Sequence, residues 1–166
     1  MALIVENGSQ VAGAESYASV ADASTYFTAR ANAAWAALAS DALREAALRQ
    51  ACDYIEAVYG LRWKGERVAI TQALSWPRDG VVVDGVELST TAIPAALMRA
   101  NIELALKASA GELLSDQGAQ VLSETVGPIS VTYAAGARQA TRYAYVENML
   151  AGLLDGGLNM VPVQRA

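Results

Sequence analysis

The feature that most constrains the fold is a helical pattern between Ser40 and Gly60. Its residues read DALREAALRQACDYIEAVYG after the serine. Ser40 is a preferred N-cap, Asp41 favours a helix N-terminus, and Gly60 is suited to end a helix. One stripe at helical spacing is apolar and leaves Arg44, Glu45 and Arg49 off it; its members are Leu43, Ala47, Ala51, Ile55 and Val58. The pattern predicts a long amphipathic helix packed on other elements.

Three further helices are predicted from caps and spacing. Ser19 and Asp22 form a capping-box pattern that starts a helix ending near Arg30. A second runs within residues 92–111 with Pro94 in its first turn, and a last one covers about 142–154. Their apolar stripes are Leu97, Ala100, Leu104 and Ala108 in the former, and Val146, Leu150 and Leu153 in the latter. We expect Trp35 to anchor the connector after the first helix.

The remaining segments lack a helical period. Two Asp-Gly pairs, at 79–80 and 84–85, indicate turns with short extended pieces. The run VLSETVGPISVTY predicts strand, turn and strand, with the break at Gly127-Pro128. The predicted fold is therefore mainly α: a small helical domain of three to four helices over residues 1–154, with an inserted β-hairpin at about 119–135. Residues 155–166 form an extended C-terminal tail.

Composition limits the classes of partner. Hydrophobic residues make up 54% of the chain, charged residues only 17%, and the net charge is −5. A charge-poor surface suits contact between subunits, and an acidic protein lacks the basic excess that usually grips phosphates. No apolar window is long enough to span a bilayer, and the first residues do not resemble a signal peptide. We expect a homo-oligomer made in a cytoplasm, without membrane contact.

Catalytic chemistry has little support in the residues. The chain has no histidine, which removes the usual general base and most zinc sites. The single cysteine, Cys52, lies in a helical pattern and reads as a buried apolar residue. Glu45 with Asp53, or Asp53 with Glu56, would be the carboxylates of a hydrolase, but such helix pairs are usually solvated. We expect no enzyme, no cofactor and no metal site.

Aromatic and basic residues cluster between the second and third long helices. Six of them fall within 17 residues: Arg62, Trp63, Lys64, Arg67, Trp76 and Arg78. Rings beside cations hold single-stranded nucleic acid by stacking on its bases. A tryptophan before a proline is equally typical of a buried side chain that packs in the core where the chain turns. Arg62 and Arg78 would then be available for a subunit interface. We favour packing for Trp76, and the two interpretations of Trp63 stay open.

The order of several motifs resembles a bacteriophage family over nearly the whole chain. These motifs are SYASVADASTYFTAR, ALRQACDYIEAVYGLRWKG, QALSWPRDGV, IPAALMRANIELAL and VGPISVTYAAG. The family often carries the label DnaT-like single-stranded DNA-binding protein. Its members are similar, in predicted layout and genome role, to the head–tail adaptors, or connectors, of long-tailed phages.

The two sides of the resemblance imply different functions. The adaptor side implies a virion structural protein of the neck, made in the host bacterial cytoplasm. It would form a ring of about twelve copies beneath the portal protein. That ring would extend the channel for packaged double-stranded DNA, without sequence-specific contact, and receive a stopper or tail-terminator protein. The label implies single-stranded DNA binding in replication through Trp63, Trp76 and Arg78. We favour the adaptor and keep DNA binding as the alternative.

Two segments are candidate hooks for an adaptor. An isolated two-stranded hairpin is marginal in water, so we expect its turn to contact a neighbour through Val126, Gly127, Pro128 and Ile129. The tail has apolar residues without a fold of its own, and the resemblance implies docking on the portal. Its docking residues would be Leu158, Met160, Val161, Val163 and Arg165. A frayed terminus is the alternative.

Overall fold

The computed structural model describes residues 2–114, 123–126, 129–132 and 141–156. Four helices carry the fold: α1 (Val20–Thr28), α2 (Asp41–Tyr59), α3 (Ala95–Ala108) and α4 (Ala144–Leu150), the last continued by a 3-10 turn, η1 (Ala151–Leu153). Short strands pair antiparallel as β1 (Glu66–Arg67) with β2 (Arg78–Asp79), β3 (Val82–Val83) with β4 (Val86–Glu87), and β5 (Ser123–Val126) with β6 (Ile129–Thr132). The predicted fold class, mainly α with an inserted hairpin, is confirmed.

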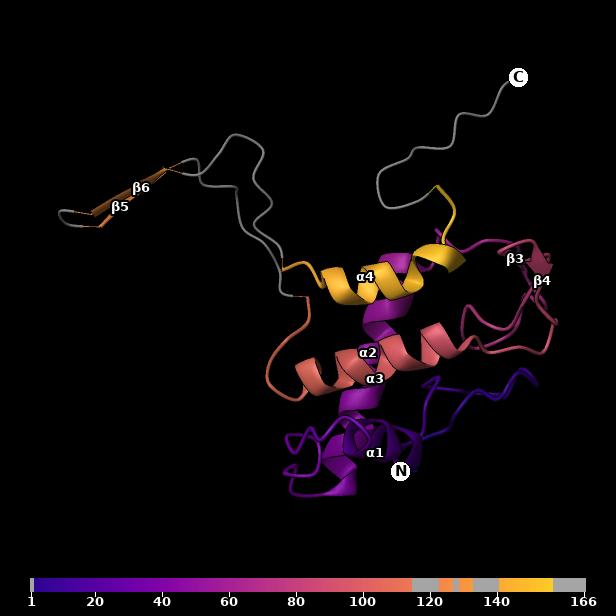
Figure 1. Ribbon diagram of the computed structural model, residues 1–166, viewed down its shortest axis with the longest axis horizontal. Coiled ribbons are helices and arrows are strands. Elements are labelled where there is room, and N and C mark those ends of the chain that lie inside the picture. The colour runs from indigo at the N-terminus through magenta and orange to yellow at the C-terminus, as the bar shows by residue number, and fades with distance from the viewer. Residues whose placement is uncertain (1, 115–122, 127–128, 133–140, 157–166) are drawn as a thin grey trace.

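The helices pack as a chain of neighbours. α2 packs against α3, α3 against α4, and α1 against α2. Figure 1 shows α3 and α4 side by side, with α2 running across α3, and draws the β5–β6 ribbon apart from the helices. The largest fully buried side chains include both aromatic and aliphatic ones: Trp35, Trp76, Tyr17, Tyr59, Phe27, Leu48, Ile55, Leu97, Leu104, Leu150, Leu154 and Val81. One core therefore joins all four helices and the segment after α2.

The predicted helix starts are confirmed by their caps. The Ser19 hydroxyl accepts a hydrogen bond from the Asp22 amide, and the Asp22 carboxylate accepts one from the Ser19 amide, which is a complete capping box. The Ser40 hydroxyl accepts from the Leu43 amide at 3.3 Å, and Gly60 caps the other end of α2. Pro94 differs from its prediction, because it is the N-cap of α3 instead of a residue in the first turn.

The apolar stripe of α2 is buried along most of its length, but the prediction for Leu43 is wrong. Ala47, Ala51 and Ile55 are buried, whereas Leu43 is 52% exposed. Spacing decides which side of a helix faces the core. How far the neighbouring elements cover that side decides burial, and they leave about half of the Leu43 side chain uncovered.

The connector between α1 and α2 is anchored as predicted. Trp35 is 1% exposed, and its indole N–H donates to the Ser24 hydroxyl at 3.2 Å. From α2, the Arg44 guanidinium donates to the carbonyls of Trp35 and Leu38, at 3.3 and 2.7 Å. An off-stripe arginine therefore closes a loop that has no regular structure of its own.

A buried asparagine joins the N-terminal segment to two helices. Asn101 of α3 is fully buried, and its Oδ1 accepts from the Ser16 hydroxyl at 2.7 Å and the Tyr17 amide at 3.0 Å. Its Nδ2 donates to the Leu48 carbonyl of α2 at 3.1 Å. Because every polar atom of this side chain has a partner, its burial is tolerated and fixes the register of three segments.

Candidate functional site

The aromatic-basic run forms a packed corner after α2. Trp76 is fully buried and Trp63 is 4% exposed, and their rings meet edge to face with centroids 5.9 Å apart. Tyr59, the last residue of α2, lies 6.1 Å from the Trp63 ring. Proline follows Trp76 through a cis peptide bond. As placed, neither indole offers an open face on which a base could stack.

Glu56 of α2 ties this corner to the helix. One carboxylate oxygen accepts from the Ser75 amide at 3.0 Å and from the Ser75 hydroxyl, while the other accepts from the Tyr17 phenol. The Tyr17 oxygen in turn accepts from the Trp76 amide at 3.2 Å. Burial, and next the charge of Glu56, raises the pKa of Tyr17 well above its ordinary value, so the phenol stays a donor.

Arg78 is used inside the corner. Its side chain donates to the carbonyls of Lys64 at 2.7 Å, Gly65 at 2.5 Å and Ser75 at 3.2 Å. The residue is 8% exposed. Burial, and next the charge of Arg67, lowers the pKa of the Arg78 guanidinium from its ordinary value. A guanidinium whose donors bind main-chain carbonyls stabilises the β1–β2 corner and has little left for a phosphate.

The last turn of the fold packs on the same corner. Residues 153–155 run antiparallel to residues 62–64: the Lys64 amide donates to the Leu153 carbonyl at 3.0 Å, and the Asp155 amide to the Arg62 carbonyl at 2.7 Å. The Lys64 ammonium donates to the Gly152 carbonyl at 2.8 Å. Leu154 is buried here. Asp155 therefore lies beside Arg62.

The outer side of the corner keeps a mixed apolar and charged surface. Leu61 is 103% exposed and Ile70 is 89% exposed. They border a hollow of about 550 Å³ whose other lining residues include Trp63, Glu66 and Arg67. Of the six residues predicted as an interface or DNA contact, Arg67 is exposed and Arg62 and Lys64 are half-buried, while the other three lie inside the fold.

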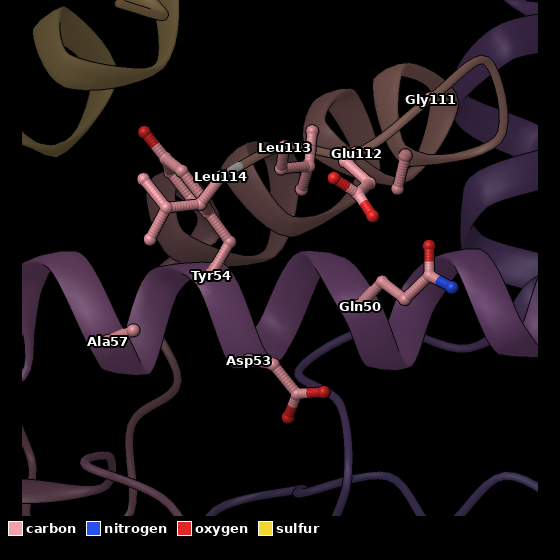
Figure 2. Close-up of a pocket in the computed structure, with 9 residues that line it drawn as sticks. Gln50, Asp53, Tyr54, Ala57, Gly111, Glu112, Leu113 and Leu114 are labelled. Atoms are coloured by element: carbon pink, nitrogen blue, oxygen red, sulfur yellow. The ribbon is translucent and has the colours of Figure 1, made fainter. Parts of the chain in front are cut away.

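A second hollow lies between α2 and the turn after α3. It measures about 510 Å³ and is bordered by Gln50, Asp53, Tyr54, Ala57, Ala108 and residues 111–114. Figure 2 shows Tyr54, Leu113 and Leu114 gathered above α2, with Glu112 beside them and Asp53 projecting from the other edge of the helix. Most of its lining side chains are apolar; Glu112 and Asp53 also border it, with the Asp53 carboxylate turned to the other edge of α2.

The carboxylates that a hydrolase would use are all on α2. Burial, then the charges of Glu15 and Glu56, raises the pKa of Asp53 from its ordinary value. Glu56 is used in the corner, and Glu45 is 3.6 Å from Arg49. Cys52 is buried, and burial raises the pKa of its thiol far above the ordinary value, as expected of an inert core cysteine. Within the described ranges, no group of three His, Cys, Asp or Glu residues could hold a metal ion, and no helix could cross a membrane.

The predicted hooks are described only in part. Val126 and Ile129 are partners at the end of the β5–β6 ladder, and Gly127 and Pro128 lie outside the described residues. The tail residues Leu158, Met160, Val161, Val163 and Arg165 also lie outside them.

Comparison with known proteins identifies the family. A family model with the description "Putative DnaT-like ssDNA binding protein" matches residues 1–166. The chain belongs to this DnaT-like family. No curated protein and no solved structure matches the chain. Membership of the DnaT-like family is thereby confirmed, whereas the adaptor role and single-stranded DNA binding both stay predictions for this member.

Three residues that hold the N-terminal half of this DnaT-like chain were missed by sequence reasoning. They are Asn101, Tyr17 and Glu6. The Glu6 carboxylate accepts from the amides of Gly8, Gln10 and Val11, at 2.8, 3.0 and 2.9 Å, and so holds the first loop. A signal was present for Glu6, since a glutamate just before Asn-Gly can bind the amides of the turn. Nothing local indicated the partners of Asn101 and Tyr17, which are far apart in the sequence.

Proposed function

We propose that this protein is a structural, non-enzymatic subunit of a phage neck. In this role it forms a ring between the portal and the tail and extends the DNA channel. The observation that carries the proposal is the burial of Trp63, Trp76 and Arg78 in the corner after α2. The residues best suited to binding single-stranded DNA are buried inside the fold. In this member of the family, the residues that a stacking site would use are therefore part of the core.

The outer surface supports a role in assembly. Leu61 and Ile70 are almost completely exposed, and Val86 and Tyr145 are 65% and 59% exposed. Leu61 and Ile70 border the same hollow, and exposed apolar side chains on a charge-poor surface favour contact between subunits. The acidic balance of the chain, −5, suits a channel that packaged DNA must pass without sticking. The portal and a stopper or tail-terminator protein are the proposed neighbours.

Microscopy of virions that carry a tagged copy tests the neck role. We expect labelled rings at the portal vertex, and capture of the portal protein by the tagged chain. As a control, a tagged major capsid protein should label the whole shell. Virions without label at the vertex, together with no capture of portal, would rule out the neck.

Single-stranded DNA binding is the second candidate, and the description of the family favours it. Within the corner, Arg67 is exposed and the half-buried Arg62 and Lys64 lie on the same stretch of chain. Binding of single-stranded DNA would then depend on these cations beside the hollow on the outer side of the corner. The buried indoles would only hold this part of the fold in place. This version needs no open tryptophan face, unlike the stacking site that the sequence suggested.

Titration of a labelled oligonucleotide at low and high salt separates the two candidates. Under the neck role, we expect no binding tighter than the non-specific range of about 10⁻⁴ to 10⁻⁶ M. Tight binding with a steep salt dependence, weakened by Arg67→Ala but not by the control Arg99→Ala on α3, would favour the DNA-binding candidate. Arg99 is exposed and lies on another element, so it controls for loss of one positive charge.

A further inference from the structure

The hollow between α2 and the turn after α3 lies close in sequence to an exposed leucine. Ala57 borders the hollow shown in Figure 2, and Leu61 follows it by four residues, just beyond the helix end at Tyr59. Leu61 is 103% exposed, so its whole side chain is available for contact. We call the hollow bordered by Tyr54, Ala57, Leu113 and Leu114 the α2 socket.

We propose that the α2 socket receives Leu61 of a second copy of this chain. The socket is lined mainly by apolar side chains. Its volume of about 510 Å³ is larger than one leucine side chain, so residues next to Leu61 can enter with it. The contact deepens the proposed neck role by naming the faces through which subunits meet. It is argued from the two surfaces alone, so its failure would leave that role to its own test.

Charge favours a second copy as the occupant. Asp53 and Glu112 border the socket, whereas three cations, Arg62, Lys64 and Arg67, and one carboxylate, Glu66, follow Leu61 within six residues, so this stretch is net basic. Seating Leu61 in the socket therefore brings a basic stretch toward an acidic rim. The ion pairs between described residues do not include Asp53 or Glu112.

The same charges argue against other occupants from this chain. The β3–β4 turn exposes Val82 and Val86, but it carries Asp84 and Glu87, which an acidic rim repels. The hollow on the outer side of the corner is bordered by two cations, Arg67 and Arg78, and one carboxylate, Glu66, so it is a poorer receptor for the basic stretch after Leu61 than the α2 socket. Leu61 and the α2 socket are the pair whose apolar surface and charge agree.

Sedimentation velocity of the full chain tests the contact, from about 1 µM to about 1 mM, a range that covers weak to moderate affinities. We expect concentration-dependent association that Leu61→Asp weakens by about 10- to 100-fold, as for a central apolar anchor. Leu43→Asp is the matched control, because Leu43 is an exposed leucine at the other end of α2. It should associate like the unmodified chain. A chain that stays monomeric over the whole range, or Leu61→Asp associating normally, would overturn the proposal.

A substitution that fills the socket should weaken association, as should loss of the Leu61 side chain, which we call the knob. Ala57→Trp places a large ring in the socket from an exposed position on α2, and we expect it to weaken association about 10-fold or more. Mixing Ala57→Trp with Leu61→Asp should restore one contact per pair, because the first variant keeps its knob and the second keeps its socket. No restoration, with both variants folded by circular dichroism, would contradict a knob-and-socket pairing.

The tail is the competing occupant, and a full-length variant distinguishes it. Leu158 follows Asp155, whose amide binds the Arg62 carbonyl, by three residues in the sequence. If Leu158→Asp abolishes association while Leu61→Asp keeps it, the tail fills the socket and the proposal is wrong. Association that survives in Leu158→Asp and is lost in Leu61→Asp supports it. Weakening of the contact by Asp53→Lys and by added salt would support the part assigned to charge.

Discussion

Asn101 and Ser16 are 85 residues apart in the chain and are joined by a 2.7 Å hydrogen bond inside the core. The same Asn101 oxygen accepts a hydrogen bond from the Tyr17 amide, and the Tyr17 phenol donates one to the Glu56 carboxylate. Glu56 in turn binds Ser75 beside Trp76. One connected set of polar contacts therefore runs from α3 through the N-terminal segment to the corner after α2, and it holds the elements on which both proposed functions depend.

Removing the asparagine from this set should be costly. We expect Asn101→Ala to lower the free energy of unfolding by about 2–4 kcal/mol, because it leaves the buried Tyr17 amide without its partner and opens a cavity. Asn148→Ala is the control, since Asn148 is exposed on α4 and should change stability by about 0.5 kcal/mol or less. Urea unfolding followed by circular dichroism measures both. Equal effects of the two substitutions would mean that the Asn101 contacts contribute nothing specific.

The Glu56 carboxylate should be irreplaceable by an amide. Three donors point at its two oxygens, from Tyr17 and Ser75, so the amide group of Glu56→Gln would face at least one of them. We expect a loss of about 1–3 kcal/mol in the free energy of unfolding and an altered tryptophan fluorescence, because Trp76 lies next to Ser75. Glu66→Gln, on exposed β1, should change neither signal. A stable Glu56→Gln with unchanged fluorescence would contradict this arrangement.

Two glycines with the same backbone geometry should respond differently to alanine. Gly65 and Gly80 have φ values of +66° and +68°. A Cβ at Gly65 would lie 2.1 Å from the Asp79 carbonyl oxygen, whereas at Gly80 it would meet nothing within 4 Å. We expect Gly80→Ala to cost about 1–2 kcal/mol from the left-handed backbone alone, and Gly65→Ala to cost at least about 2 kcal/mol more. Thermal unfolding of both variants checks the difference, and similar midpoints would refute the close approach of β1 and β2.

Asp53 should make stability depend on pH. Its pKa is raised in the folded state, so the folded protein binds the proton more tightly than the unfolded chain does. The stability linked to this proton is present below the unfolded pKa and is lost as pH rises through the folded value. At neutral pH, Asp53→Asn should therefore raise Tm slightly, on the order of 1–2 °C because solvent screens the site. The gain should vanish in acid.

Calorimetry at pH 7 and pH 3 measures this gain. Glu87→Gln on exposed β4 is the control for loss of one negative charge, and its effect should be smaller at pH 7. A Tm for Asp53→Asn that is lower than that of the unmodified chain at pH 7 would show that the carboxylate is stabilising, with the sign opposite to our expectation.

Local sequence was a good guide wherever a helix end is made by its own residues. Ser19 and Ser40 cap helices through contacts three residues away, and the stripe of α2 from Ala47 onward faces the core. Leu43 shows the limit of this reasoning, because its exposure depends on how far the neighbouring elements extend. The pairing of β1 with β2 was not predicted, because two-residue strands carry no periodic pattern.

For the candidate site, local sequence indicated which residues matter but not what they do. Trp63, Trp76 and Arg78 were correctly picked out as a group, yet stacking and packing use the same residue types. Only the positions of Glu56, Ser75 and the Lys64 carbonyl show that the corner is filled and its arginine engaged. The exposed Leu61 and the α2 socket were not found from the pattern at all, because a leucine after a helix looks the same whether it is covered or not.

The sequence by itself determined the helices, the N-caps of α1 and α2 and the mainly α class, because hydrogen bonds and apolar spacing within a few residues decide these. Tertiary structure alone decided that Arg78 faces main-chain carbonyls inside the fold and that Leu61 faces outward. Burial is a property of what other segments place around a residue. Those segments, such as residues 153–155 beside 62–64, come from distant parts of the chain.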